Sequence, residues 1–571
     1  MWTNVANCHD CYACVRACPV KAIRVNVGHA EVVEELCILD GACVAACPQG
    51  AKQVEQHGER VEAYLAQGRV AFSLAPSLAA AFTSEPGVVA AALRRLGAHA
   101  VAETSEVTRW VSQRHWERAE ALGSVISSCC PAVVNLITHY YPGVLPHLAD
   151  VVSPMIAHGR TAKRVLGADT RVVFVGPCIA KKKEMRERGL SGAVDAVLTF
   201  AELKEFLTRL LPQWEELEPE PFDTFVASVS ANEVADQRRF PLPGGMVPLL
   251  ANGADPEDND VLVVTGITQC AELLTDIPCH GMPAKMVELM ACDEGCVGGP
   301  GVESDIPVYR RARKVRAYAR HSLPRRPMGS VKYGEVDLTR GYEDQRLHLP
   351  QPSEEEVRAI LASIGKREPE DELNCGACGY DSCREKAVAV YQGMAEREMC
   401  IPYMRRKAES MADVTIAATP TGIVVVNREL HVLAFNPAAE RIWGCQAAEH
   451  VGRPLWRLGD PSRVESVFAR QASASAVVRL EKQDRVIREH LVYDSKNDLV
   501  IIMLSDITEE TKRQEHFADL KEASLERAQE VIDKQMRVAQ EIAGLLGETT
   551  AETKAILTQL MELFQGSGGR S

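Results

Sequence analysis

Three short segments, far apart in the chain, place cysteine next to glycine, proline or lysine. They are Ser127–Pro131, Gly176–Glu184 and Glu288–Gly299, and they supply four thiols for one buried metal site: Cys130, Cys178, Cys292 and Cys296. Thiolates select iron-sulfur clusters or zinc. The spacing of four between Cys292 and Cys296 predicts a helix that carries both sulfurs on one face. The three segments together predict a single four-thiolate site.

The first 55 residues contain two cysteine runs. The first run has the bacterial ferredoxin spacing C-x2-C-x2-C-x3-C-P and the second is an imperfect repeat; the cysteines are Cys8, Cys11, Cys14, Cys18, Cys37, Cys43 and Cys47. In such runs the fourth cysteine binds the other cluster. We therefore expect one 4Fe-4S cluster at Cys8, Cys11, Cys14 and Cys47, and a second cluster at Cys18, Cys37 and Cys43.

Asp40 stands where the second run should have its middle cysteine. It would supply an oxygen ligand to a 4Fe-4S cluster, or a small exogenous ligand would complete the site. Alternatively, the site keeps a 3Fe-4S cluster and Asp40 points to solvent. A changed ligand would shift the reduction potential of this cluster.

A third cysteine group lies after a charged and polar linker. Cys375, Cys378 and Cys383 have the spacing C-x2-C-x4-C, and Cys400 follows near Pro402. The group predicts a 4Fe-4S module over residues 352–405, with zinc as the structural alternative. It resembles the small four-cysteine domain of electron-transfer complexes and corrinoid-protein activators.

Composition limits the remaining possibilities for this chain of 571 residues. Its formal net charge of -14 argues against nucleic acid or an anionic membrane as the main partner. No apolar run reaches the roughly 18 residues that a membrane span needs, and cysteines stand where a signal peptide would be. We expect a cytoplasmic protein. The 19 cysteines are bunched into motifs, which favours cluster ligation over disulfides.

In their order, the three segments of the four-thiolate site resemble the signature segments of iron-only (di-iron) hydrogenases, over residues 68 to 320. The resemblance implies an H-cluster: a 4Fe-4S cubane on Cys130, Cys178, Cys292 and Cys296, bridged by Cys296 to a di-iron unit with carbon monoxide, cyanide and azadithiolate. It also implies roles for four further residues. Lys181 would hold a cyanide ligand, Cys129 would relay protons, Met290 would pack on the di-iron ligands, and Glu184 would belong to an outer proton path.

Apolar runs predict the architecture around this site. Val70–Leu74, Val125–Ile126 and Arg171–Val175 read as strands separated by helices, which indicates an α/β fold. Ligands of such sheets bind outside the carboxyl ends of the strands. We therefore predict a multidomain α/β and α+β chain, whose two-lobed α/β domain holds the site in a cleft.

The chain departs from the hydrogenase pattern in three places. Gly176 stands where the family has methionine, Ala132 and Val133 follow Pro131 where it has tryptophan, and no acidic run is found around Trp110 to His115. Changed surroundings alter both cluster tuning and proton delivery. We therefore expect slow hydrogen chemistry. Cys270 and Cys279 match no ligand of the family and are interpreted as buried free thiols, and His115 and His280 as ordinary packed or surface residues.

The C-terminal third resembles a signalling region. Residues 409–508 resemble a PAS domain, with closing strands at Val486–Tyr493 and Leu499–Leu504. Residues 509–565 predict two apolar-faced helices, broken at Gly547 and restarted by a capping box of Thr549 and Glu552. Residues 566–571 are expected to be disordered. Helices without a core of their own indicate a homodimer or a docked partner.

These elements favour a sensory iron-only hydrogenase that reacts reversibly but slowly with H2 and protons. Electrons would pass through the 4Fe-4S clusters to or from a redox partner protein, and the PAS domain and helices would signal to a separate kinase or phosphatase. A catalytic bifurcating or fermentative hydrogenase fits the PAS domain poorly. The alternative from another class is a cluster-carrying redox sensor or iron-sulfur assembly protein without the di-iron unit.

Overall fold

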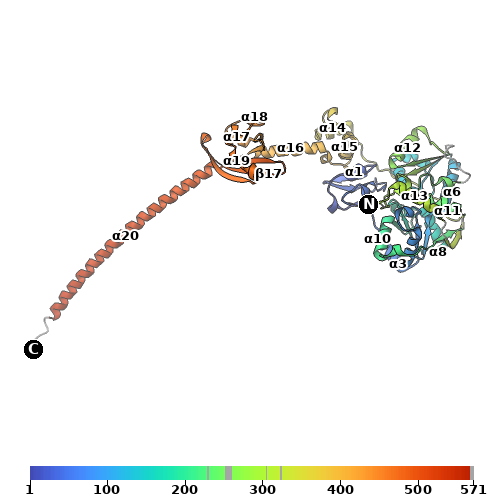
Figure 1. Cartoon of the computed structure of the whole chain (residues 1–571), viewed down its shortest axis with the longest axis horizontal. Coiled ribbons are helices and arrows are strands. Elements are labelled where there is room, and N and C mark those ends of the chain that lie inside the picture. The colour runs from blue at the N-terminus through green and yellow to red at the C-terminus, as the bar shows by residue number, and fades with distance from the viewer. Residues whose placement is uncertain (228–229, 251–259, 304, 322–324, 566–571) are drawn as a thin grey trace. The chain divides into compact units, whose positions relative to one another are not determined.

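The computed structural model describes residues 1–227, 230–250, 260–303, 305–321 and 325–565. The chain forms two compact units, Met1–Met404 and Arg405–Ser571 (Figure 1). The first unit contains the cysteine motifs, and the second contains the C-terminal sheet and helix. Among the described residues, no helix combines the length and the apolar character that crossing a membrane requires.

The N-terminal module consists of two small antiparallel ladders and two short helices, each of which begins inside a cysteine run. The elements are β1 (Trp2–Thr3) paired with β4 (Lys52–Gln53), β2 (Ile23–Asn26) paired with β3 (His29–Val32), α1 (Ala13–Ala17) and α2 (Ala42–Ala45). The turn between β2 and β3 is Val27–Gly28, where both residues have positive φ. The two halves of the module are therefore alike in structure as well as in cysteine spacing.

The larger lobe of the central domain is a six-stranded parallel sheet covered by helices. Its strand order is β13-β10-β6-β5-β8-β9, and the bounds are β5 (Val70–Leu74), β6 (Ala100–Glu103), β8 (Arg171–Gly176), β9 (Ala196–Thr199), β10 (Phe222–Val226) and β13 (Arg325–Val331). Strands buried on both faces read as continuous apolar runs, and every residue of β5 is buried. The strand predictions at residues 70–74 and 171–175 are confirmed.

The smaller lobe is a separate three-stranded parallel sheet in the order β11-β12-β7. Its strands are β7 (Val125–Ile126), β11 (Val261–Thr265) and β12 (Met286–Met290). One face of this sheet packs into the core of the larger lobe through Val125, Val261 and Met286, and Ile126, Val287 and Leu289 belong to a second core. The expected two-lobed α/β architecture is confirmed by the two separate sheets. The helices of the two lobes are α3 (Gly58–Gln67), α4 (Leu78–Ala81), α5 (Pro86–Arg95), α6 (Thr108–Leu122), α7 (Pro131–Tyr140), α8 (Pro154–Leu166), α9 (Lys181–Glu184), α10 (Phe200–Leu210), α11 (Ala231–Arg238), α12 (Ile267–His280) and α13 (Val308–Ala319).

The third cysteine group lies in a small helical domain at the end of the first unit. Its helices are α14 (Glu354–Ser363), α15 (Cys383–Tyr391) and the beginning of α16 (Ile401–Ala418). Val357, Leu361, Ile364 and Ala387 form its core together with Cys400. A core this small suits a domain that is completed by a metal centre.

The second unit begins within α16 and contains a five-stranded antiparallel sheet in the order β15-β14-β18-β17-β16. Its elements are β14 (Gly422–Asn427), β15 (Val432–Phe435), α17 (Pro437–Trp443), α18 (Ala447–His450), α19 (Ser462–Arg470), β16 (Ala474–Leu480), β17 (Arg485–Asp494) and β18 (Leu499–Asp506). The helices between β15 and β16 pack on the sheet around Phe468 and Ile442. The two predicted closing strands are confirmed as β17 and β18.

One continuous helix, α20 (Thr508–Gln565), forms the rest of the described chain (Figure 1). The predicted break at Gly547 and the capping box of Thr549 and Glu552 are therefore wrong. A glycine inside a helix costs about 1 kcal/mol relative to alanine, which the flanking turns tolerate. The predicted disorder of residues 566–571 lies outside the described residues.

Candidate metal centre

The three cysteine segments of the central domain meet in one cavity between its two sheets. Each segment follows the carboxyl end of a parallel strand: β7 leads to Cys130, β8 to Cys178 and β12 to Cys292. The cavity is lined by Cys130, Cys178, Cys292 and Cys296, together with Cys129, Lys181, Met290, Asp40 and several prolines and glycines. Three segments separated by up to about 160 residues thus form a single donor set.

The helix predicted to carry Cys292 and Cys296 is absent. Met290 ends β12, and Cys296 lies in a short 3-10 turn, η7 (Gly295–Gly298). Glu294 and Gly295 both have left-handed backbone, with φ of 58° and 74°, which prevents a regular helix from starting at Cys292. The turn nevertheless places both sulfurs in the same cavity.

The four thiols interact with one another as a buried, electron-rich group. Burial raises the pKa of Cys178 to about 11 and that of Cys296 to about 12, and in both cases Cys130 raises it further. Burial also raises the pKa of Cys292 well above its ordinary value, with Cys178 and Cys130 adding to the effect. Buried thiols whose pKa is raised in this way lose their protons when a metal cation replaces them, and the iron of an iron-sulfur cluster is such a cation with the ligand type it prefers. The residues therefore fit a cluster.

Lys181 brings a positive charge to the wall of this cavity. Its ammonium donates to the Glu184 carboxylate at 2.8 Å and to the Cys129 carbonyl at 3.3 Å. Burial opposes the charge, but Glu184 and Cys178 together raise the pKa of Lys181 above its ordinary value. Lys181 is therefore a fixed cation beside the thiols.

Glu184 is fully buried, and cations take both of its carboxylate oxygens. One oxygen accepts from Lys181, and the other accepts from Arg340 at 3.1 Å. Arg340 also pairs with Glu187 and lies over the Tyr342 ring. Glu184 thus lies at the centre of a buried ion-pair network. Nothing in the sequence indicated that Arg340, 156 residues away, would belong to it.

Cys129 lies between the cavity and helix α6. Its sulfur is 4.0 Å from His115 Nε2, and burial raises the pKa of its thiol well above the ordinary value. His115 is fully buried and also contacts Ser128, the residue before Cys129. The interpretation of His115 as an ordinary packed residue missed this contact, because no motif links positions 115 and 129.

A second buried acid lies near the site. Glu288 is on β12, two residues before Met290, and its side chain is buried near the backbone of Met246 and Gly244. Burial raises the pKa of Glu288 to about 8, and its charge acts on Cys129 and Cys296. Glu288 is the first residue of the third cysteine segment, and this position could have identified it as a site residue from the sequence.

Two of the departures from the hydrogenase pattern have a structural reason. A Cβ atom at Gly176 would lie 2.6 Å from the Phe174 ring, so Phe174 fills the room that a larger side chain would need. Ala132 lines the cavity and Val133 belongs to the core of the smaller lobe. Met290 lines the cavity and is the last residue of strand β12. Cys270 packs beneath it and donates to its carbonyl at 3.6 Å, whereas Cys279 is exposed.

Asp40 does not point to bulk solvent. Its side chain lines the cavity of the central domain, and burial raises the pKa of its carboxyl. Its charge acts on Cys18, Cys37 and Cys43 of the N-terminal module and also on Cys292. Asp40 therefore lies between two sets of thiols.

Electrostatic contacts connect the N-terminal thiols in two sets. Cys14 interacts electrostatically with Cys8 and Cys47, whereas Cys43 interacts with Cys37 and Cys18. Cys11 is exposed. The second group is the one that adjoins the central domain, because Asn135 donates to the Ile38 carbonyl at 3.1 Å and Tyr140 to the Leu36 carbonyl at 2.6 Å.

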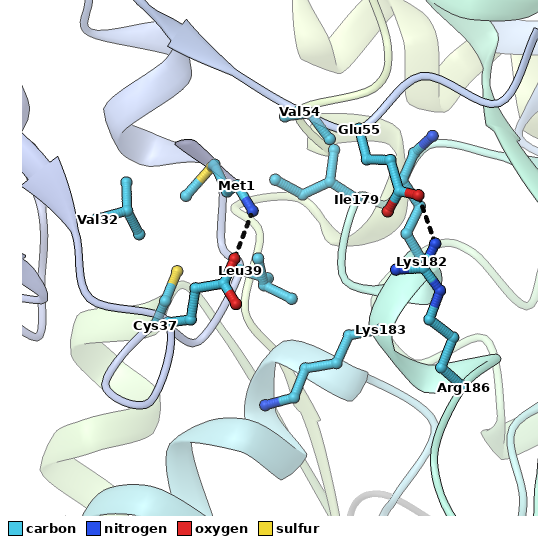
Figure 2. A pocket seen from close by; sticks show the side chains of 11 residues that line it. Met1, Val32, Cys37, Leu39, Val54, Glu55, Ile179, Lys182, Lys183 and Arg186 are labelled. Carbon is cyan, nitrogen blue, oxygen red and sulfur yellow. Dashed lines mark hydrogen bonds and ion pairs between the residues drawn. The ribbon is translucent and has the colours of Figure 1, made fainter. Parts of the chain in front are cut away.

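A cavity of about 250 Å³ lies at this junction (Figure 2). Cys37 and Leu39 line it from the N-terminal module, and Ile179, Lys182 and Lys183 line it from the central domain. In Figure 2 the Lys183 ammonium points away from the ion pair of Glu55 and Arg186. Cys37 therefore lines this cavity and lies at the junction between the N-terminal module and the central domain.

The third cysteine group also shares one cavity. It is lined by Cys375, Cys378, Cys383 and Cys400, with Lys386 and Tyr380 beside them. Burial lowers the pKa of Lys386, and the thiols of Cys400 and Cys378 oppose that effect. A buried cation beside four cysteines again fits an anionic cluster.

This domain packs against the N-terminal module. A Cβ atom at Gly379 would lie 2.8 Å from Val15 Cγ1, and Arg16 donates to the Ala377 carbonyl at 3.2 Å. Tyr380 is buried, and burial raises the pKa of its hydroxyl well above the ordinary value, with Cys378 and Cys18 contributing. Tyr380 therefore lies within electrostatic reach of two cysteine groups.

Comparisons with known proteins agree with this division of the chain. A family model described as the iron only hydrogenase large subunit, C-terminal domain, matches residues 68–300. A 4Fe-4S dicluster model matches residues 1–48, an Fe-S cluster model matches 371–402, and a PAS fold model matches 416–512.

Individual relatives fall into two kinds. The chain is 30% identical over 364 residues to the NADP-reducing hydrogenase subunit HndD of Solidesulfovibrio fructosivorans, covering 50% of this chain and 60% of that one. It is 26% identical to the cytosolic Fe-S cluster assembly factor NAR1 of Encephalitozoon cuniculi, covering 42% of this chain and 72% of that one. The chain thus spans less than two thirds of the length of HndD.

A solved structure of the FeFe-hydrogenase HydA1 from Chlamydomonas reinhardtii aligns with 51% of this chain and 100% of its own, at 18% identity and a TM-score of 0.40. The family models, with the cavity of four cysteines, confirm the resemblance found in the sequence motifs. The chain therefore carries a domain that matches the iron-only hydrogenase family model, joined to segments that match a 4Fe-4S dicluster domain, an Fe-S cluster domain and a PAS fold.

Proposed function

We propose that this chain is a sensory iron-only hydrogenase that reacts reversibly but slowly with H2 and reports the result through its PAS domain. One observation carries the proposal. A single cavity brings four cysteines together with Lys181 and Cys129. A plain cubane needs neither a fixed ammonium nor a fifth, unligated thiol at its wall.

The cavity residues have distinct roles in this proposal. Cys130, Cys178, Cys292 and Cys296 would hold the H-cluster. When bound, this group supplies the heterolytic splitting of H2 into protons and electrons. Lys181 neutralises anionic ligands beside it, and Cys129 moves protons between the cavity and the protein interior.

The proposed electron route follows the contacts between modules. Asp40 lies beside the central cavity and its charge acts on Cys43. The cluster of Cys18, Cys37 and Cys43 would therefore be the first to exchange electrons with the central site. Tyr380 lies within electrostatic reach of Cys18 and Cys378, which connects this module to the 375–400 cluster. Cys400 is followed directly by α16, the helix that leads to the PAS sheet. The redox state of the last cluster would thus act on the start of that helix.

The output of the proposed sensor is a protein contact. α20 exposes large apolar side chains along its length, among them Phe517, Val531 and Met536. Such a helix gains stability when it packs against another. We propose that it forms a homodimer and engages a separate kinase or phosphatase.

Slow turnover follows from the surroundings of Cys129. Phe174 fills the room next to Gly176, and His115 lies where the hydrogenase pattern would supply an acidic run. Changes around a metal centre commonly reduce activity 10- to 100-fold. A sensor needs occupancy by H2 rather than flux, so low turnover is compatible with this function.

The second candidate function is a cluster-carrying redox sensor or assembly protein without the di-iron unit. The likeness to NAR1 and to the mouse cytosolic iron-sulfur assembly component 3 favours it. Infrared spectroscopy after treatment with the di-iron maturation machinery separates the two functions. A sensory hydrogenase shows carbon monoxide and cyanide bands that change under H2. A chain with full iron content and no such bands is the second kind of protein.

A further inference from the structure

We propose that His115 positions the Cys129 thiol: its Nε2 atom accepts the S–H hydrogen bond and sets the direction in which Cys129 holds its proton. This inference rests on the proposed function, in which Cys129 moves protons. The two residues lie on different elements, His115 in α6 and Cys129 in the segment after β7. Nε2 is 4.0 Å from the Cys129 sulfur, and the imidazole has no exposed surface.

The hydrogen bonds of His115 determine its tautomer. Nδ1 lies 2.7 Å from the Val111 carbonyl, which can only accept, so Nδ1 carries the hydrogen. Nε2 receives the backbone N–H of Ser128 at 3.1 Å and is therefore the acceptor; its one lone pair is shared between this N–H and the Cys129 thiol at 4.0 Å, which is the longer and weaker of the two contacts. The Ser128 hydroxyl, 2.9 Å from Nε2, donates to the Val151 carbonyl at 2.6 Å. Burial, which lowers the pKa of His115 to about 4, is consistent with this neutral ring.

The competing partners of Cys129 do not offer a similar contact. Lys181 donates to the carbonyl of Cys129, not to its sulfur. Glu184 is saturated by Lys181 and Arg340, and Glu288 acts on Cys129 only through its charge. Among the residues that the structure describes, Nε2 is the side-chain atom within hydrogen-bonding distance of the Cys129 sulfur.

The arrangement has a direct consequence for proton delivery. Cys129 lines the cavity, yet its hydrogen is directed at His115 on the opposite side. The thiol must leave this hydrogen bond before it can present its proton to the cavity. His115 exchanges no proton in this role, so no charge is created on the ring. A held thiol slows proton delivery, which suits a sensor of low turnover.

The test is the S–H stretching band of Cys129, measured by infrared difference spectroscopy on the full chain before the di-iron unit is inserted. The band is identified by subtracting the spectrum of Cys129→Ala. His115→Asn keeps an amide near the Nδ1 position but removes the acceptor at Nε2, whereas His115→Gln places an amide oxygen there. We expect the band to move to higher wavenumber in His115→Asn and to return close to the wild-type position in His115→Gln.

An unchanged band in His115→Asn overturns the inference. His115→Phe repeats the test with a ring of similar size that has no acceptor, in case the asparagine variant does not fold. The S–H band is measured without the di-iron unit, so its outcome does not depend on whether that unit can be inserted. Absence of carbon monoxide bands in matured protein would refute the proposed function, whereas the S–H band would still test the contact between His115 and Cys129.

Discussion

Gly41 lies so close to Pro300 that a Cβ atom at position 41 would be 2.5 Å from the Pro300 Cβ. Gly41 follows Asp40 in the N-terminal module, and Pro300 lies two residues after the end of η7, the turn that carries Cys296, in the central domain. Gly41 also has a φ of 84°, which favours glycine. This contact fixes the Asp40 loop against the four-cysteine cavity.

Gly41→Ala should therefore weaken electron transfer between the N-terminal clusters and the central site. The added methyl group must push the Asp40 loop away from Pro300, and the left-handed backbone adds strain of about 1–2 kcal/mol. The matched control is Gly50→Ala, because Gly50 also has positive φ but has no atom within 4 Å of its Cβ position. The measurement is the rate at which N-terminal clusters are reduced under H2, by rapid-freeze EPR. Equal rates in the two variants would contradict the contact's role.

Replacing Asp40 tests how the second N-terminal cluster is completed. Asp40→Cys supplies a fourth thiolate next to Cys18, Cys37 and Cys43, so we expect a 4Fe-4S cluster with a shifted midpoint potential. Asp40→Asn offers a weaker neutral ligand and should favour a three-iron cluster. EPR-monitored redox titration distinguishes the two. If neither change affects any cluster signal, Asp40 is not near a cluster.

The buried acid Glu288 predicts a pH-dependent stability. Because its pKa is raised to about 8, the folded chain binds this proton more tightly than the unfolded chain does. Its contribution to stability is complete below the ordinary glutamate pKa of about 4.3 and is lost as pH rises toward 8. Glu288→Gln stays neutral throughout. Between about pH 5 and pH 8 the wild type should therefore lose up to ~4 kcal/mol of its free energy of unfolding relative to Glu288→Gln.

Urea unfolding followed by tryptophan fluorescence at several pH values measures this difference. Glu294→Gln, at an exposed position of the same segment, is the control and should keep a constant offset from the wild type. A constant offset for Glu288→Gln as well would show that Glu288 does not hold a proton in the folded chain at neutral pH.

Gly379→Ala should separate the third cysteine domain from the N-terminal module. The methyl group would meet Val15 and the backbone of Arg16, whereas Gly393→Ala, at a similar φ in the same domain, meets no atom within 4 Å. We expect slower reduction of the 375–400 cluster under H2 in Gly379→Ala only. Equal reduction rates in both variants would remove this contact from the electron route.

The sequence predicts those features that depend on local spacing or apolar runs. The strands β5, β7 and β8 follow from continuous apolar residues. The turn at Glu294 and Gly295 was missed because a spacing of four suits a helix, although Asp, Glu and Gly in succession favour a turn. Gly547 was overinterpreted, since one glycine does not end a helix.

Contacts between distant segments were beyond prediction. His115 and Cys129 are separated by the end of α6 and by β7, and nothing in either residue type indicates that they meet. The same holds for Arg340 and Glu184, which are 156 residues apart. Such pairs depend on how the two lobes close around the cavity.

The central claim is that H2 reacts at the four-cysteine cavity and that its electrons reach the cluster of Cys375 to Cys400. EPR spectra of the matured full-length chain under H2, compared with those of the Cys296→Ala variant, test it most directly. The account predicts reduced-cluster signals in the wild type, including one that disappears in Cys378→Ala, and none under H2 in Cys296→Ala. Clusters that stay oxidised under H2 in the matured wild type, yet are reduced by dithionite, would contradict it.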